Sequence, residues 1–199
     1  MKDPAARQKI LVEAINCIEK CGIEGCTIRN IAKEAGISFS SLHYYFESKE
    51  ELVKEAMAQA INASFEDLYE IWRRRTNDLS AVTEILNFLF DGAIRYPGIT
   101  RAGLYALLMN GKVDGLFAVK LNELLIEIAQ EISRKHAVNE NMLLLKLVQA
   151  FSSVLFLGIS PRVFTKFSSL DFQNEERRNE LIRLIENDLR RFCYCDGDN

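Results

Sequence analysis

The chain has 199 residues and a mass of 22.7 kDa, enough for one large domain or for a small domain joined to a larger one. Only three prolines and ten glycines interrupt it, and 48% of its residues are hydrophobic, a composition typical of a soluble protein rich in helices. The net charge is −3, but the seven basic and seven acidic residues among the first fifty cancel, which leaves room for a basic face near the N-terminus.

The composition also argues against several classes of protein. The N-terminus lacks the apolar run of a signal peptide, and the most apolar uncharged stretch, residues 147–161, is too short to span a bilayer. Five cysteines without a CxxC pair predict neither a disulfide framework nor a zinc site. We therefore expect a cytoplasmic protein that contacts no membrane and holds no metal or cofactor.

Three helices are predicted in the first 47 residues. The first extends from an N-cap at Asp3 to Gly22 and repeats apolar residues at helical spacing. Thr27 caps a second helix of only two turns, which ends at Gly36. Ser38 then caps a third short helix that runs through Tyr45.

The segment SKEE at residues 48–51 predicts the start of a long fourth helix. It has the form of a capping box, in which the side chains of Ser48 and Glu51 accept each other's backbone N–H groups. We expect this helix to close with Arg73-Arg74-Arg75 just before Asn77-Asp78, because cations complement the dipole at the end of a helix.

Five more helices are expected in the rest of the chain. An apolar helix follows Asn77-Asp78 and ends at Tyr96-Pro97-Gly98, where proline forbids its continuation. The others are predicted at about 100–110, 114–135, 140–159 and 174–192, with an irregular segment before the last. The sequence thus predicts an all-α fold of about nine helices.

Two short helices joined by a glycine-containing corner, with a helix before and after them, form a helix-turn-helix. In this motif the second helix, here residues 38–45, lies in the major groove of DNA. Leu42 and Phe46 are four residues apart and can both face the core. The other side chains divide between groove and support, and they are Phe39, Ser40, Ser41, His43, Tyr44 and Tyr45. For Tyr44, packing between the first and third helices is the alternative to DNA contact.

The segment GIEGCTIRNIAKEAGISFSSLHYYFESKEEL, residues 22–52, resembles the DNA-binding signature of the TetR (tetracycline repressor) family of transcriptional regulators. The likeness lies in the Gly22-to-Thr27 spacing, TIRxIA at 27–32, AGIS at 35–38, LxYYF at 42–46 and SKExL at 48–52. It implies an all-helical homodimer in which an N-terminal domain, 1–47, binds a palindromic operator. A ligand-responsive and dimerising domain, 48–199, would follow, with helix 48–75 bridging the two.

The resemblance implies roles for individual residues by their position. It predicts phosphate contacts by Thr27, Tyr45 and Lys49, and a phosphate or base contact by Arg29. It places Phe39, Ser40, Ser41 and His43 on the base-facing surface, where Phe39 departs from the small or polar residue typical of the family.

The resemblance also implies a ligand cavity among the later helices. The aromatic side chains and the methionine spread over those helices are Phe65, Tyr69, Trp72, Phe88, Tyr105, Met109, Phe117 and Phe151. They favour an apolar or aromatic effector, although simple core packing explains any one of them. An effector that moves the far end of helix 48–75 would tilt the DNA-binding domains and release the operator.

Helices 140–159 and 174–192 carry more apolar surface than one core face requires. The resemblance implies that both pair with their symmetry mates in a four-helix dimer interface. The residues predicted to form it are Leu144, Phe151, Leu155, Leu181, Ile185 and Leu189.

Two other classes of protein fit the sequence less well. No P-loop, GxSxG, HExxH or dinucleotide fingerprint is present, and only two histidines exist to act as bases, so we do not expect an enzyme. A partner-binding module that has lost DNA affinity is the other alternative. Arg29 and Lys49 beside an uncharged third helix argue against it.

The cysteines leave a question open. Cys17 and Cys21 lie four residues apart on a predicted helix, where they could bind a metal or sense an oxidant, but small buried thiols explain them equally well. Cys193 and Cys195 lie in a tail that is expected to fray.

Overall fold

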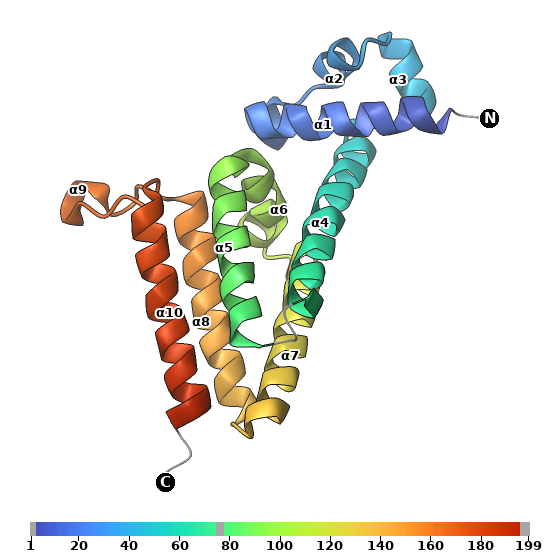
Figure 1. The fold of residues 1–199 in the computed structure, drawn as a ribbon. Coiled ribbons are helices and arrows are strands. Elements are labelled where there is room, and N and C mark those ends of the chain that lie inside the picture. The colour runs from blue at the N-terminus through green and yellow to red at the C-terminus, as the bar shows by residue number, and fades with distance from the viewer. Residues whose placement is uncertain (1–2, 75–77, 196–199) are drawn as a thin grey trace. The chain divides into compact units, whose positions relative to one another are not determined.

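The computed structural model describes residues 3–74 and 78–195, with only the backbone at Ala106, Asn110 and Cys195. Within these residues it has ten helices and no strand (Figure 1). The helices are α1 Pro4–Gly25, α2 Ile28–Ala35, α3 Phe39–Tyr45, α4 Lys49–Arg74, α5 Leu79–Arg95, α6 Pro97–Asn110, α7 Leu116–His136, α8 Glu140–Ile159, α9 Thr165–Ser168 and α10 Glu175–Cys195. The predicted all-α fold is confirmed, and the additional helix is α9, a single turn inside the segment expected to be irregular.

The helices form two compact units. Unit 1 contains Met1–Ser64 and Tyr96–Phe117, and unit 2 contains Phe65–Arg95 and Ala118–Asn199. Helix α4 therefore contributes residues to both. The domain boundary predicted between residues 47 and 48 assigns α6 to the regulatory part, whereas the structure groups α6 with the N-terminal helices. The functional division at that boundary stays a prediction.

Caps and glycines set the helix ends in unit 1 much as the sequence predicts. The Thr27 hydroxyl accepts the backbone N–H of Asn30 at 3.2 Å and caps α2. Gly36 is left-handed, with φ 71° and ψ 31°, and this conformation makes the tight corner between α2 and α3. At Gly22, φ is 71° and ψ is 176°, but α1 resumes and continues to Gly25. The expected stop at Gly22 is therefore a kink within the helix.

The predicted capping box at the start of α4 is only half correct. The Ser48 hydroxyl accepts the N–H of Glu51 at 3.1 Å, as expected. The Glu51 carboxylate instead accepts the N–H of Glu47 at 2.6 Å. The carboxylate reaches one residue further back than in a capping box and thereby closes the link between α3 and α4.

The core of unit 1 joins α1 to the helix-turn-helix. Its most deeply buried side chains, all at most 1% exposed, include Ile10, Ile18, Ile31, Leu42, Phe46 and Leu52. Helix α6 adds Ile99 and Ala102 to the edge of this core. The first and sixth helices thus share one apolar cluster with α2 and α3.

Helix α6 meets α1 at a contact that only glycine fits. A Cβ atom on Gly98 would lie 2.7 Å from the Cα of Glu19 and closer still to its carbonyl oxygen. The Glu19 carboxylate accepts the N–H of Ile99 at 2.9 Å, so α1 supplies the cap for the start of α6. The helix begins at Pro97 rather than near Thr100, because proline suits a first helical turn.

In unit 2, α5, α8 and α10 lie side by side (Figure 1). The chain before α10 is fixed to this layer by Phe172, whose ring stacks on Phe90 with the centroids 6.1 Å apart. The buried Arg178 guanidinium donates to the carbonyl oxygen of Phe172 at 3.1 Å and pairs with Asp91 at 3.0 Å. These contacts fix the C-terminal end of the segment that contains α9 to α5.

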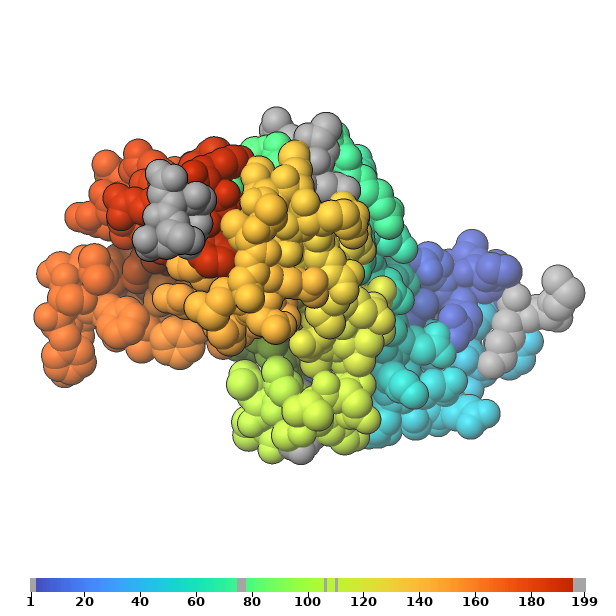
Figure 2. Space-filling model, turned by 90° about the horizontal axis from the view of Figure 1, so that it is seen from below, coloured from blue at the N-terminus to red at the C-terminus, as the bar shows by residue number. Residues whose placement is uncertain are grey.

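That segment exposes several apolar side chains. It protrudes in orange from the surface in Figure 2. Its backbone closes on itself where the Phe172 N–H donates to the Pro161 carbonyl at 2.9 Å. The apolar side chains that it exposes are Val163, Phe164, Phe167 and Leu170, of which Phe167 is 85% exposed.

Helix α8 is apolar on more than one face. By length and composition it is the one helix in the described part of the chain that could cross a membrane, although core helices of soluble proteins meet the same criterion. The uncharged stretch 147–161, expected to be too short to span a bilayer, overlaps this longer helix, in which Leu143 to Leu145 add apolar residues before Lys146. Seven of its residues are buried in unit 2.

The Gly98 contact yields a test of how α6 is held. We expect Gly98→Ala to lower the free energy of unfolding by about 1–3 kcal/mol, because the added methyl group overpacks against the Glu19 backbone. The matched control is Gly92→Ala in α5, where no atom lies within 4 Å of the added Cβ. That change should be neutral or stabilise by up to about 1 kcal/mol. Urea unfolding of both variants measures the difference, and equal stabilities would contradict the contact.

Candidate nucleic-acid interface

Three serine hydroxyls gather at the start of α3. The Ser38 hydroxyl accepts the N–H of Ser41 at 3.0 Å and thereby caps the helix. It also lies 2.9 Å from the Ser40 hydroxyl and 2.7 Å from that of Ser41. All three residues are exposed, and α3 contains no carboxylate. This end of α3 therefore offers hydrogen-bond donors and acceptors without negative charge.

The opposite face of α3 is anchored as predicted. Leu42 and Phe46 are both fully buried in the core of unit 1. The Arg7 guanidinium covers the Phe46 ring, 4.7 Å from its centroid, and pairs with Glu55 on α4. Helix α3 is consequently fixed in rotation, and its polar side chains keep one orientation toward solvent.

Phe39 and His43 form one aromatic pair on the exposed side. Their ring centroids lie 4.6 Å apart in an edge-to-face arrangement. Both residues are exposed, and Phe39 keeps 50% of its accessible surface. The pair places an apolar ring edge beside an imidazole, a combination able to contact a thymine methyl group and a base edge together.

The two tyrosines of α3 differ in their surroundings. Tyr44 is 56% exposed, whereas Tyr45 is half-buried and packs against the core of unit 1. Their rings meet edge to face with centroids 5.3 Å apart. The packing alternative considered for Tyr44 therefore belongs to Tyr45, because helical spacing alone does not show which ring turns inward.

Tyr45 ends α3, and the other residues expected to contact phosphates lie at the starts of α2 and α4. Thr27 and Arg29 are exposed, and Lys49 is the half-buried first residue of α4. Burial raises the pKa of Cys26 to about 12, and the Lys49 ammonium opposes that rise. Lys49 thus acts electrostatically on Cys26, the residue before Thr27.

One further cation was not evident from the sequence. The Lys9 ammonium lies 3.8 Å from the position that a Cβ on Gly36 would occupy, at the corner between α2 and α3. No local pattern connects a residue in α1 with that corner. Lys9, Arg29 and Lys49 thus belong to three different helices, α1, α2 and α4. No single charged run in the sequence reveals them as a group.

Residues 10–56 match the profile of the family described as bacterial regulatory proteins, tetR family. These residues thus have the sequence profile of a TetR-family DNA-binding domain. The match runs from α1 into α4 and includes the whole helix-turn-helix, so the resemblance seen in residues 22–52 is confirmed.

Individual relatives match only part of the chain. A nucleoid occlusion factor, SlmA of Mannheimia succiniciproducens, is 35% identical over 97 residues, which cover 48% of this chain and 44% of that protein. The transcriptional regulator PksA of Bacillus subtilis is 45% identical over 56 residues, covering 28% and 27% of the two chains. The chain thus spans less than half the length of these curated relatives.

The likeness in fold covers nearly the whole chain. The transcriptional regulator FadR from Bacillus subtilis, in complex with stearoyl-CoA, superposes with a TM-score of 0.62. The superposition covers 94% of this chain and 97% of that one at 15% identity. At such low identity it shows that the two chains share a fold and nothing further.

The residues predicted for a ligand cavity are divided between the two units. Phe65, Trp72 and Phe151 are buried in unit 2, where Tyr69 and Phe88 are half-buried. In unit 1, Phe117 is half-buried, while Tyr105 and Met109 are 37% and 67% exposed. A cavity lined by this set stays a prediction.

The predicted dimer residues also differ in burial. Leu144, Leu155, Leu181 and Ile185 are half-buried, whereas Phe151 and Leu189 lie in the core of unit 2, at most 2% exposed. The last two cannot present their side chains to a partner, because α8 and α10 pack on α5 and on each other. The side chains left outside include Leu145 and Leu184, at 63% and 67%.

The structure shows which of the cysteines are buried as small apolar side chains and which is exposed. Cys17 and Cys26 are buried, and Cys21 is exposed. Cys193 is buried near the end of α10, so the tail is not frayed at this residue, and the Cys195 thiol lies outside the described side chains. Among the residues described, no group of three or more His, Cys, Asp or Glu is arranged to hold a metal ion.

Proposed function

We propose that this protein is a cytoplasmic transcriptional regulator of the TetR family, without enzymatic activity, that binds an operator in double-stranded DNA as a homodimer. In this proposal it acts as a repressor and is released by a small apolar or aromatic effector. The exposed face of α3 is the observation that carries it. That face is polar, contains no carboxylate and is fixed by two buried side chains.

Such a face suits the major groove of DNA. Ser40 and Ser41 stand at the N-terminal end of α3, the part of a recognition helix that contacts base edges in this motif. The Phe39–His43 pair extends the same exposed side. Thr27, Arg29 and Lys49 would bind the backbone on either side, and such contacts position a protein without reading sequence.

Separate roles for backbone and base contacts can be tested with four variants and a duplex recovered by in vitro selection. Lys49→Ala and Thr27→Ala should weaken binding to selected and random DNA alike, and Lys49→Ala should lower the salt slope by roughly one ion per protomer. Ser41→Ala and His43→Ala should remove about 1–3 kcal/mol of discrimination between the two duplexes. Fluorescence anisotropy at several salt concentrations measures both, and equal losses for all four variants would refute the division.

The dimer is proposed from the outer surface of α8 and α10. Met142, Leu145, Gln149, Ser152 and Phe156 follow one another on α8 at alternating steps of three and four, the spacing of a helix-pairing seam, and all are exposed. An exposed apolar seam of this kind marks a protein-interaction surface.

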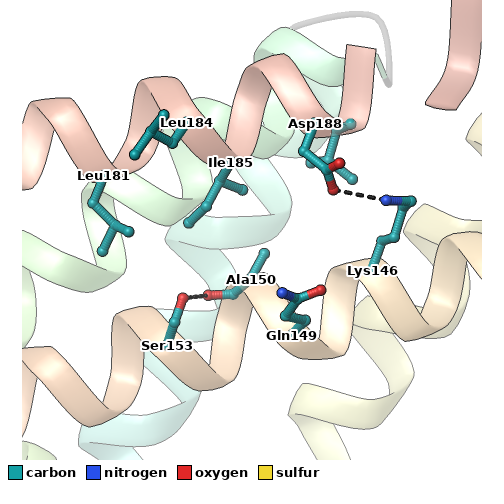
Figure 3. A pocket seen from close by; sticks show the side chains of 9 residues that line it. Lys146, Gln149, Ala150, Ser153, Leu181, Leu184, Ile185 and Asp188 are labelled. Carbon is teal, nitrogen blue, oxygen red and sulfur yellow. Dashed lines mark hydrogen bonds and ion pairs between the residues drawn. The ribbon is translucent and has the colours of Figure 1, made fainter. Parts of the chain in front are cut away.

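A groove between α8 and α10 continues this surface. It has a volume of about 270 Å³ and is lined by apolar side chains of α10 above α8 (Figure 3). Lys146 and Asp188 close one end with an ion pair of 2.7 Å. Leu184, which is 67% exposed, stands at its edge. Covering these side chains by the same helices of a second copy would remove them from water.

Sedimentation at micromolar concentration tests this interface. We expect the unchanged protein to be a dimer and Leu145→Glu or Leu184→Glu to weaken it at least about 100-fold, because burying an unpaired charge costs several kcal/mol. Val113→Glu is the matched control, since Val113 is 75% exposed and lies outside α8 and α10. A monomeric unchanged protein, or a Leu145→Glu variant that dimerises normally, would contradict the proposal.

The effector is proposed from an unpaired polar group in unit 2. Trp72 is fully buried, and its indole N–H finds no acceptor among the described residues. A buried donor without a partner destabilises a protein unless something bonds it. The neighbours on the same face of α4 are apolar, with Phe65, Leu68 and Ile71 all buried. We infer an effector with an apolar body and a hydrogen-bond acceptor; the FadR neighbour, for its part, holds stearoyl-CoA.

Helix α4 offers the route from effector to DNA. It is one unbroken helix from Lys49 to Arg74 and contributes to both units. An effector that binds beside Trp72 would act on the same helix that begins next to α3. Linkage requires the effect to be reciprocal, so operator DNA should weaken effector binding by the same factor, typically ~5 to 150-fold.

The role of the Trp72 N–H can be tested by calorimetry with stearoyl-CoA, 1-naphthol and naphthalene, of which only the last lacks an acceptor oxygen. Trp72→Phe removes the donor and keeps a ring. It should weaken binding of an acceptor-bearing compound about 2- to 10-fold, the net value of one hydrogen bond, and leave naphthalene and DNA affinity nearly unchanged. Equal losses for 1-naphthol and naphthalene would contradict the donor role.

A further inference from the structure

Three thiols lie together where α1 is kinked. Cys17 and Cys21 stand one turn apart on α1, and their sulfur atoms are 3.7 Å from each other. Cys26 follows the kink at Gly22, and the Cys17 thiol contributes to the raised pKa of Cys26. Nothing in the proposed DNA-binding or effector-binding surfaces uses these groups.

The three thiols differ in access to solvent. Cys17 is 7% exposed and Cys26 is fully buried, both as part of the core of unit 1. Cys21 is exposed, and its thiol donates to the Cys17 carbonyl oxygen at 3.0 Å. A dissolved oxidant can therefore reach Cys21 first and finds a buried thiol behind it.

We propose that Cys17 and Cys21 form a reversible disulfide on exposure to peroxide and that this bond lowers the DNA affinity of the protein. The statement about DNA rests on the proposed function, whereas the chemistry of the pair does not. The pair is not preformed as a disulfide, because its sulfur atoms are still 3.7 Å apart, against about 2.05 Å in the bond.

The reaction balances with hydrogen peroxide as the oxidant. The Cys21 thiolate attacks one peroxide oxygen, the O–O bond breaks, and hydroxide leaves and takes up the thiol proton as water. The Cys17 sulfur then attacks the resulting sulfenic acid, the S–O bond breaks, and the second water leaves with the Cys17 proton. Two thiols and one peroxide give one disulfide and two waters.

The surroundings set the rate of the first step. Desolvation raises the pKa of Cys21, and the neighbouring Cys17 thiol adds to the rise, while Lys49 and Lys20 oppose it. The thiolate is therefore the minor form at neutral pH, and its fraction grows as the pH rises. We expect oxidation to be slow at pH 7 and faster at pH 9.

The bond would deform the last turns of α1. Residues four apart on a helix have Cβ atoms about 5–6 Å apart, whereas a disulfide requires about 3.5–4.5 Å. The turn that must tighten contains Glu19, whose backbone supports Gly98 and whose carboxylate caps α6 at Ile99. It also precedes Cys26 and the Thr27 cap of α2. The disulfide would therefore displace backbone that contacts both the helix-turn-helix and α6.

Peptide mapping of the protein after peroxide treatment tests the bond. Trypsin cleaves after Lys9, Lys20 and Arg29, which separates Cys17 in peptide 10–20 from Cys21 and Cys26 in peptide 21–29. We expect the two peptides to be joined and to separate on reduction. The joined pair should persist in Cys26→Ala and disappear in Cys21→Ala. The latter change should be tolerated, because Cys21 is exposed and alanine favours a helix. Unlinked peptides, or a loop within 21–29, would overturn the proposal.

Hydrogen exchange and DNA binding test the consequence. On oxidation we expect faster exchange in the end of α1 and in the first turn of α6, and a loss of affinity for the selected duplex of at least about fivefold, the lower end of typical coupling. Both changes should reverse with dithiothreitol and be absent in Cys21→Ala. A disulfide that leaves exchange and affinity unchanged would overturn the switch. If the reduced protein binds no DNA, the proposed function fails, and the peptide and exchange results still decide the inference.

Discussion

Helix α6 is held to α1 by a contact that tolerates no side chain. Gly98 lies against the backbone of Glu19, and the Glu19 carboxylate caps α6 through the N–H of Ile99. Because α1 also packs on α2, one helix connects the start of α6 with the motif that positions α3. A displacement of the last turns of α1, for example by chemistry at the thiols of Cys17 and Cys21, would reach the recognition helix through the same core.

Local signals in the sequence predict the helix-turn-helix almost residue by residue. The caps at Thr27 and Ser38 and the left-handed Gly36 act within one turn of chain, so their effect does not depend on distant contacts. Such local signals do not show which segments far apart in the sequence meet. The grouping of α6 with unit 1 depends on Gly98 fitting against Glu19, and no periodicity in either helix shows that contact.

Burial on α8 and α10 shows a second limit of the sequence pattern. The spacing of apolar residues places Phe151 and Leu189 in the dimer interface, whereas the structure buries both within unit 2. The pattern shows that a helix has apolar faces but not how many neighbours cover them. Leu145 and Leu184, which the pattern ranks no higher, are the side chains left exposed. A helix apolar on two faces can be divided between core and partner only when its neighbours are known.

Packing explains two of the three thiols near the kink in α1 and leaves the third unexplained. Cys17 and Cys26 fill the core as small apolar side chains. Cys21 is exposed, so burial does not require a thiol there, and alanine would favour the helix more. Its sulfur nevertheless lies at contact distance from the buried Cys17 thiol. Because that pair spans Glu19, a bond between the two sulfur atoms would act on the turn that supports α6.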